Sequence, residues 1–231
     1  KTYVYNAKII FLNASTLNSA WILMNSATDV WEGGLGSSSG ELGHNIMDHH
    51  LGVGAGGRME GYEDKYTFGR RANGIYIPRY QNIGTDKRDY LRGFGYQGSG
   101  NRGGWGSKVA EFTIGADFKE AISEPGGWSM GMMGFGEVLP DHKNFATLDK
   151  TVKDKWGLNV LKIDAELKEN EMKMRKDMLA DAIEMLTNAG VKDVKGYDAN
   201  AVLGRGIHEM GTARMGADPK TSVVNKHNQI W

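Results

Sequence analysis

Glycine is spread through the whole of this chain and is not gathered into a linker. It accounts for 33 of the 231 residues, about twice its ordinary share. The surrounding sequence contains six tryptophans and no repeat or low-complexity stretch. Because glycine permits tight turns and close backbone approaches that other residues resist, this distribution predicts a folded chain with many turns and closely packed strands.

Short segments with aromatic and β-branched character predict a mostly antiparallel sheet. Several of them contain glycine, which marks bulges or crowded strand crossings. We expect strands in residues 74–78, 90–96, 128–135 and 145–149. The stretch over residues 33–57, in contrast, has the composition of loops.

A strand, a turn of small residues and a helix are predicted at the start of the chain. Residues 3–12 begin with alternation and end in an apolar run, which is typical of a strand entering a buried, parallel-type sheet. Residues 13–16 supply the turn, and a helix follows over about 17–26 with Ser15 or Thr16 as its cap. These are the parts of a nucleotide-binding half-site, although many other α/β units share them.

One long amphipathic helix is predicted over about 165–189, with Gly190 at the position that follows its end. Its buried stripe is expected to consist of Met178, Leu179, Ala182, Ile183 and Leu186. Together the elements predict an α+β fold. We expect an α/β portion, a domain with a mostly antiparallel sheet flanked by helices, and a return to a glycine-rich loop.

Composition narrows the classes of function. Lys plus Arg and Asp plus Glu both number 28, so the basic excess of a nucleic-acid surface is absent. No apolar run approaches the roughly 20 residues that span a bilayer. The absence of cysteine excludes disulfides and cysteine-ligated metal, and it leaves the redox compartment open.

Several ionisable residues crowd together near residue 48. They are His44, Asp48, His49 and His50. His44 and Asp48 have the i,i+4 spacing of one helix face, but a metal site needs three or four convergent ligands. Adjacent histidines point apart in most backbone conformations, so we favour a structural role, or a place at the edge of an active site, over metal binding.

Three other polar residues have simple interpretations. His142 and His227 lie in polar segments that are typical of surface turns. Ser38 is the centre of Gly36-Ser-Ser-Ser-Gly40, which approximates the nucleophile elbow of serine hydrolases. That segment follows a loop and not a buried strand, so a plain turn is favoured over hydrolase chemistry.

The segment from Gly204 to Gly216 is the strongest candidate for an active-site loop. It has four glycines in thirteen residues and lacks the periodicity of a helix or strand. His208 is the residue in it whose side-chain type can move a proton near neutral pH. Met210 and Met215 flank the small residues, as in a loop packed against a flat ligand.

Three separated segments resemble, in the same order, motifs of the glucose-methanol-choline (GMC) family of flavin oxidoreductases. Residues 14–26 resemble its second signature, in which a small-residue turn leads into a helix. Leu42-Gly-His-Asn-Ile-Met-Asp-His49 is similar to its Gly-x-Asn-Leu-x-Asp-His segment. His208-Glu-Met-Gly-Thr-Ala-Arg-Met-Gly216 is similar to its His-x-x-Gly-Thr-x-x-Met-Gly segment.

The resemblance implies an FAD-dependent enzyme with His208 as the active-site base. The imidazole would accept the hydroxyl proton of a CH–OH group while a hydride leaves the same carbon for flavin N5. By the same resemblance, the residues near the cofactor would be Ala14, Ser15, Asn18, Gly211 and Thr212.

The resemblance also implies a division of the chain. Residues 1–50 would be part of the FAD-binding domain, residues 51–200 the substrate-binding domain, and residues 201–231 a return to the FAD domain. No Gly-x-Gly-x-x-Gly motif precedes the first motif segment, where this family carries it. The family's second catalytic Asn or His, a few dozen residues past the histidine loop, would lie beyond Trp231. We therefore expect an internal part of a longer enzyme and an incomplete GMC fold, inactive by itself.

Within the family, the sequence of these motif segments is most similar to the branch of gluconate 2-dehydrogenase large subunits and glycoside 3-dehydrogenases. This implies oxidation of a sugar, glycoside or sugar-acid hydroxyl, with a small companion subunit and a cytochrome or other electron acceptor as candidate partners. It favours the bacterial periplasm over the cytoplasm. The alternative is a non-catalytic subunit or structural module derived from a GMC enzyme.

Overall fold

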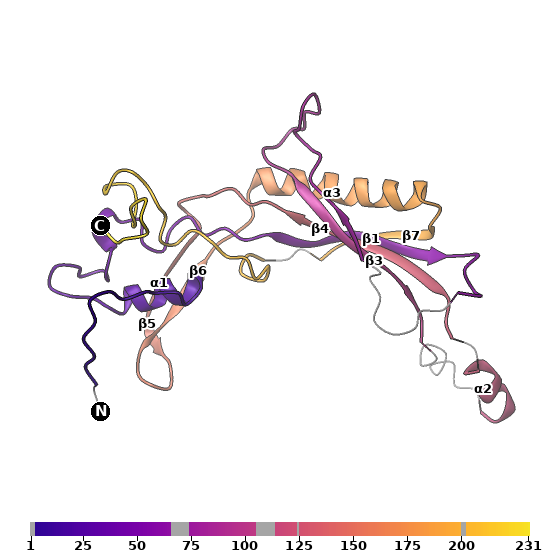
Figure 1. The fold of residues 1–231 in the computed structure, drawn as a ribbon, viewed down its shortest axis with the longest axis horizontal. Coiled ribbons are helices and arrows are strands. Elements are labelled where there is room, and N and C mark those ends of the chain that lie inside the picture. Colours follow the sequence, from indigo (N-terminus) through magenta and orange to yellow (C-terminus); the bar gives the residue numbers. More distant parts are fainter. Residues whose placement is uncertain (1–2, 66–73, 105–113, 124, 200–201) are drawn as a thin grey trace. The chain divides into compact units, whose positions relative to one another are not determined.

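A computed structural model describes residues 3–65, 74–104, 114–123, 125–199 and 202–231. The chain forms two compact units, and Figure 1 labels most of their elements. Unit 1 comprises Lys1–Asp48, Leu139–Glu166 and Gly206–Trp231, and unit 2 comprises His49–Val138 and Leu167–Arg205. The segment Leu139–Glu166, which lies inside the stretch expected to bind substrate, thus packs with the two ends of the chain.

Unit 2 is built on a five-stranded antiparallel sheet with the order β2-β3-β4-β1-β7. Its strands are β1 (His50–Met59), β2 (Gly74–Ile77), β3 (Phe94–Arg102), β4 (Trp128–Gly136) and β7 (Lys192–Asp198). Its helices are α2 (Ala116–Ala121) and α3 (Glu169–Asn188). Helix α3 lies along one face of the sheet, over β1, β4 and β7 (Figure 1).

The core of unit 2 lies between α3 and this face. Side chains alternate across a strand, so every second residue of the central strands points at the helix. The buried apolar residues include Val53, Ala55, Phe94, Tyr96, Met132, Met174, Met178, Ala182 and Leu186. Glycine lets the helix come close, because a Cβ atom at Gly134 would lie 2.2 Å from the Met178 sulfur.

Helix α3 confirms the long helix predicted from the apolar stripe. Met178, Ala182 and Leu186 are 0% exposed, and the other two predicted positions pack at the edge of the core. The helix begins where the Lys168 N–H donates to the Glu171 carboxylate at 3.0 Å. Gly190 follows its end with φ of 85°, the left-handed conformation predicted for that position.

Unit 1 combines short elements with long loops. Its described elements are α1 (Thr16–Met24), the 3-10 helix η1 (Ser37–Ser39) and a hairpin of β5 (Phe145–Lys153) and β6 (Asn159–Asp164). Its core consists of Ala20, Leu23, Met24, Leu42 and Val223. The Trp21 indole N–H donates to the Asn159 carbonyl at 2.6 Å, which ties α1 to β6.

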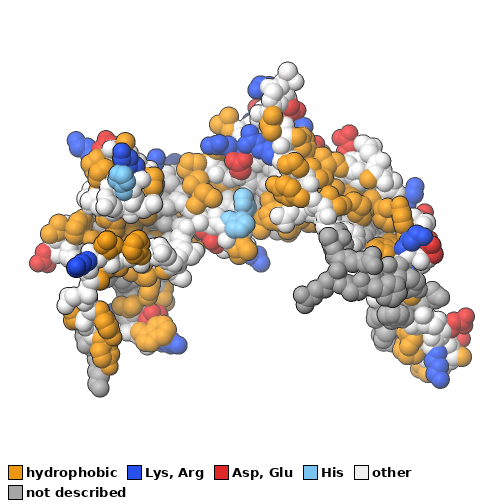
Figure 2. All heavy atoms as spheres, in the orientation of Figure 1, with side chains coloured by type: hydrophobic (Ala, Val, Ile, Leu, Met, Phe, Trp, Pro, Cys, Tyr) orange, Lys and Arg blue, Asp and Glu red, His pale blue; other side chains and the backbone are white. Residues whose placement is uncertain are grey.

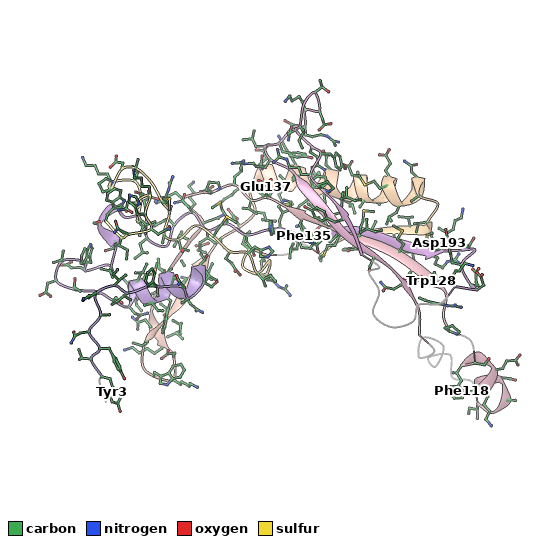
Figure 3. The ribbon with its side chains drawn as sticks, in the orientation of Figure 1. Tyr3, Phe118, Trp128, Phe135, Glu137 and Asp193 are labelled. Carbon is green, nitrogen blue, oxygen red and sulfur yellow. The ribbon has the colours of Figure 1, made fainter. Side chains whose placement is uncertain are left out.

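The strand predicted over residues 3–12 is not formed. Its large apolar side chains, Tyr3, Val4, Tyr5, Ile9, Ile10 and Phe11, are 70–88% exposed. Tyr3 is labelled on this extended segment in Figure 3, and hydrophobic side chains are visible along it in Figure 2. A strand needs a neighbouring backbone to pair its N–H and C=O groups, and no described strand pairs with this segment.

Other strands differ from the prediction in place or length. Strand β1 occupies residues that were mostly expected to be a loop, because its four glycines lower the strand propensity of the segment and interrupt its alternating pattern. Strand β3 begins at Phe94 and not at residue 90, and β6 and β7 were not predicted. Strand β4 confirms its prediction, with Trp128 and Phe135 near its opposite ends (Figure 3).

The predicted combination of helices with a mostly antiparallel sheet is confirmed. Helix α1 begins one residue before the predicted start, and Ser15 precedes it with φ of 65° and no side-chain cap hydrogen bond. Within the described residues, no helix joins the length and the apolar character needed to cross a membrane.

Candidate functional site

The second and third motif segments lie against each other in unit 1. Met47 and Met210 exchange two backbone hydrogen bonds, with N···O distances of 2.9 Å and 3.0 Å. The Gly43 N–H donates to the Thr212 carbonyl at 2.6 Å. The histidine loop is therefore held along its length by the turn that precedes unit 2.

The start of α1 joins the same group. The Thr16 hydroxyl donates to the Glu209 carbonyl at 2.6 Å, and the Thr212 hydroxyl donates to the Thr16 carbonyl at 3.4 Å. Thr212 is 1% exposed, so its hydroxyl needs this partner. All three segments that carry the sequence motifs thus meet in unit 1.

The Asp48 carboxylate accepts hydrogen bonds from two backbone N–H groups of the histidine loop. Asp48 is 3% exposed, and its Oδ2 accepts from the Gly206 N–H at 2.6 Å. Its Oδ1 accepts from the His208 N–H at 3.2 Å. The stretch from His44 to Asp48 forms turns and isolated bridges and no helix, so their i,i+4 spacing does not place them on one helix face.

Gly211 fits a place that admits no side chain. Its φ is 98°, and a Cβ atom there would lie 1.9 Å from the Asn45 carbonyl oxygen. Asn45 is itself in the left-handed region with φ of 62°, and its amide donates to the Glu41 carboxylate at 2.9 Å. Close backbone packing between the two loops therefore explains the glycine next to Thr212.

His208 and several apolar neighbours form an exposed part of unit 1. His208 is exposed, as are Ile207 at 81%, Met210 at 49% and Met215 at 50%. The backbone of His208 is fixed by Asp48 while its ring lies at the surface.

The predicted cofactor residues at the first motif surround the start of α1. Ser15 and Asn18 are exposed, and Ala14 is half-buried with its N–H donating to the Ser19 hydroxyl at 3.3 Å. Because Ser15 does not cap the helix, the amides of the first turn are not satisfied by it. Hydroxyl, amide and helix-start donors at the beginning of α1 fit a group that carries oxygen acceptors.

The histidines between residues 44 and 50 do not gather in one place. The His44 ring stacks on His142 with ring centres 3.8 Å apart, within unit 1. In unit 2, His49 lies 3.3 Å from the Gly136 carbonyl, and His50 is 1% exposed with Nε2 3.1 Å from the Met174 sulfur. The described residues contain no group of three or more His, Asp or Glu side chains arranged to hold a metal ion.

The remaining candidates agree with their simple interpretations. His227 is exposed near the end of the chain. His142 is in a turn, with its side chain 57% exposed. Ser38 is an exposed residue of η1, so a turn explains why this sequence approximates the nucleophile-elbow motif.

Sequence reasoning missed the supporting role of Asp48. Its partners are 158 and 160 residues away along the chain, so no local spacing pattern connects them. A buried carboxylate needs hydrogen-bond donors, but the local sequence around Asp48, which is rich in histidine, gives no sign that the residue is buried.

Known proteins match this chain over long stretches. A sequence model of the family described as GMC oxidoreductase matches residues 140–231. The 2-methyl-1,2-propanediol dehydrogenase of Mycolicibacterium austroafricanum is 31% identical over 238 residues, which cover 98% of this chain and 41% of that protein.

Two further relatives are more distant. The gluconate 2-dehydrogenase flavoprotein of Pantoea cypripedii is 25% identical over 123 residues, covering 51% of this chain and 20% of that protein. The fructose dehydrogenase large subunit of Gluconobacter japonicus is 24% identical over 225 residues, covering 95% and 40%. The chain spans less than half the length of each of these relatives. With the family match at residues 140–231, they show that this chain belongs to the GMC oxidoreductase family.

Proposed function

We propose that this chain is part of an FAD-dependent dehydrogenase that oxidises a CH–OH group, with His208 as the base that takes the hydroxyl proton. One observation carries the proposal. The first motif segment, through Thr16, is hydrogen-bonded to the histidine loop at Glu209, so the residues expected near the cofactor and the expected base belong to one compact group of unit 1.

The residues around the start of α1 would hold one part of the cofactor. Ser15 and Asn18 are exposed there and offer a hydroxyl and an amide, and the first-turn amides of α1 add further donors. Gly211 and Thr212 would keep the histidine loop close to it. Bound FAD supplies the acceptor for the hydride that leaves the substrate carbon.

His208 would supply the proton transfer. Its backbone N–H donates to Asp48 at 3.2 Å, and the residue is exposed. An imidazole nitrogen that lies within hydrogen-bond reach of a substrate hydroxyl can take its proton as the C–H bond breaks. The exposed Ile207, Met210 and Met215 side chains would reduce the access of water to that hydroxyl.

The substrate is proposed to be an alcohol that carries more than one oxygen function. The matched relatives are named for a propanediol, gluconate and fructose, and these compounds share a hydroxyl group next to a second oxygen-bearing carbon. A sugar, glycoside or sugar acid therefore fits, and so does a small diol. A companion subunit and a cytochrome or another acceptor are proposed partners, since one relative is named as a large subunit.

The test is anaerobic flavin bleaching in the full-length protein that contains this chain. Purified protein should carry flavin absorbance, and mixing with a panel of diols, sugars and sugar acids should bleach it with at least one member. His208→Ala should retain FAD and reduce it about 100-fold or more slowly, since general base catalysis contributes about 10²–10⁴-fold.

His227→Ala is the matched control, because His227 is an exposed histidine in a turn of the same unit. It should bleach at the native rate. Unchanged bleaching in His208→Ala would remove His208 from its role. Native protein without flavin would support the alternative, a non-catalytic subunit.

A further inference from the structure

A single carboxylate binds two backbone amides that flank one residue of the histidine loop. Asp48 accepts from the N–H groups of Gly206 and His208 through its two different oxygens, at 2.6 Å and 3.2 Å. The residue between these amides is Ile207. Two amides that converge on one anion in this way form a small concave anion-binding turn.

Ile207 has a backbone conformation that its side chain disfavours. Its φ is 57°, in the left-handed region where a β-branched residue is an outlier. The Ile207 side chain is 81% exposed, so burial does not compensate for this conformation. The turn therefore depends on the bonds of its backbone, and a carboxylate that accepts two N–H groups is a strong acceptor for it.

Gly206 makes the approach of the carboxylate possible. A Cβ atom on this residue would lie 2.4 Å from the Asp48 Oδ1 atom and 2.7 Å from its Cγ atom. Any side chain at 206 would push Asp48 away from both amides. Asp48 and Gly206 are also the residues at which the chain leaves unit 1 and returns to it, so their bond joins the two connecting segments.

We propose that Asp48 is a positioning residue for His208. Its charged carboxylate holds the Gly206-Ile207-His208 turn in the left-handed conformation that sets the direction of the His208 side chain. The catalytic consequence rests on the proposed function, in which His208 is the base. The stabilisation of this turn by Asp48 does not rest on the proposed function, since it follows from the hydrogen bonds alone.

Asp48→Asn tests directly whether the carboxylate stabilises the turn. The asparagine side chain keeps the size of the original, but it has one oxygen acceptor, and its NH₂ group faces one of the two amides. Hydrogen–deuterium exchange of the full-length protein, read without substrate, should become about 10- to 100-fold faster at the Gly206 and His208 amides. Flavin reduction should slow while the FAD content stays native.

Asp154→Asn is the matched control. The Asp154 carboxylate also accepts two backbone N–H groups, from Trp156 at 2.8 Å and Leu158 at 3.0 Å, in the hairpin turn of unit 1. This variant should speed exchange in its own turn and leave both the Gly206 and His208 amides and the rate of flavin reduction unchanged.

A second substitution separates the strained turn from general loss of stability. Asparagine tolerates the left-handed region better than isoleucine, so Ile207→Asn in the Asp48→Asn background should restore at least part of the exchange protection and of the flavin reduction rate. General destabilisation would not be reversed by an exposed residue. If Asp48→Asn does not fold, Ile207→Asn alone should slow exchange at the His208 amide in the native background.

The outcomes distinguish the two proposals. Faster exchange with unchanged flavin reduction would keep Asp48 as the support of the turn and overturn its role in positioning His208 for catalysis, while His208→Ala decides separately whether His208 is the base. Native exchange in Asp48→Asn would overturn the role of Asp48, whatever the reduction rate. In the absence of that variant, unchanged exchange in Ile207→Asn would overturn it.

Discussion

Arg175 of α3 forms an ion pair with Asp198 at the end of β7, and it does so from the interior of unit 2. The Arg175 side chain is 1% exposed, whereas that of Asp198 is 36% exposed. The guanidinium also donates to the Leu51 carbonyl at 2.9 Å. One side chain of the helix thus connects both strands at this edge of the sheet.

Arg175→Met should destabilise the protein by about 1–3 kcal/mol. Removing one member of a fully buried pair costs about 3–5 kcal/mol, but water can solvate the half-exposed Asp198 and reduce the loss. Urea unfolding of the full-length protein measures the change. Arg58→Met is the control, because Arg58 pairs with Asp193 at the surface, with side chains 61% and 62% exposed, and should change stability little. Equal effects of the two variants would contradict the buried role of Arg175.

His50 should make the stability of unit 2 depend on pH. Burial, together with the charge of the nearby Arg175 guanidinium, lowers the pKa of His50 from the ordinary value of 6.5 to about 3. The folded state therefore keeps His50 neutral at pH values where the unfolded chain protonates it. This contribution to stability is complete above pH 6.5 and is lost as the pH falls toward 3.

The expected loss is up to about 1.4 kcal/mol per pH unit below the unfolded-state pKa. His50→Gln carries no titrating group and should have a flatter dependence of unfolding free energy on pH between about 6.5 and 5. His227→Gln, at an exposed position, should keep the native dependence. Identical slopes in native protein and His50→Gln would contradict the assignment.

The stripe of α3 predicts a large difference between two methionines of the same helix. Met178 is 0% exposed and Met172 is 42% exposed. Met178→Ala should cost about 2–5 kcal/mol through lost burial and a cavity under the helix. Met172→Ala should stay within about 0.5 kcal/mol of the native protein. Thermal unfolding of both variants compares them, and similar losses would show that the helix does not pack as described.

The parts of the fold that were predictable are those set by local periodicity. Helix α3 follows from apolar residues three and four apart, and β4 from its aromatic and methionine-rich alternation. Strand β1 was hidden because residues such as Gly54 and Gly57 have no side chain to show alternation. A Cβ atom at Gly54 would lie 2.1 Å from the Met132 carbonyl oxygen, so crowding between neighbouring strands, which no local pattern reports, selects glycine there.

The candidate site was predictable in its residues but not in its contacts. The glycines and His208 mark an unusual loop by composition alone. That Thr16 and Asp48 hold this loop depends on hydrogen bonds across 193 and 160 residues of chain. The strand expected over residues 3–12 shows the opposite error, since a local pattern favoured an element for which no described strand supplies a partner.

Gly211 offers the sharpest test of how the histidine loop is packed. Gly211 and Gly40 both have positive φ, of 98° and 77°. A Cβ atom at Gly211 would lie 1.9 Å from the Asn45 carbonyl oxygen, whereas a Cβ atom at Gly40 would have no neighbouring atom within 4 Å. Gly40→Ala should therefore cost only the left-handed penalty, about 1–2 kcal/mol. Gly211→Ala should cost about 1–3 kcal/mol more through the clash, and it should also lower FAD retention and flavin reduction because the loop must move from Asn45. Urea unfolding and flavin content of the two variants in the full-length protein measure the difference, and equal losses would mean that the two loops are not in this contact.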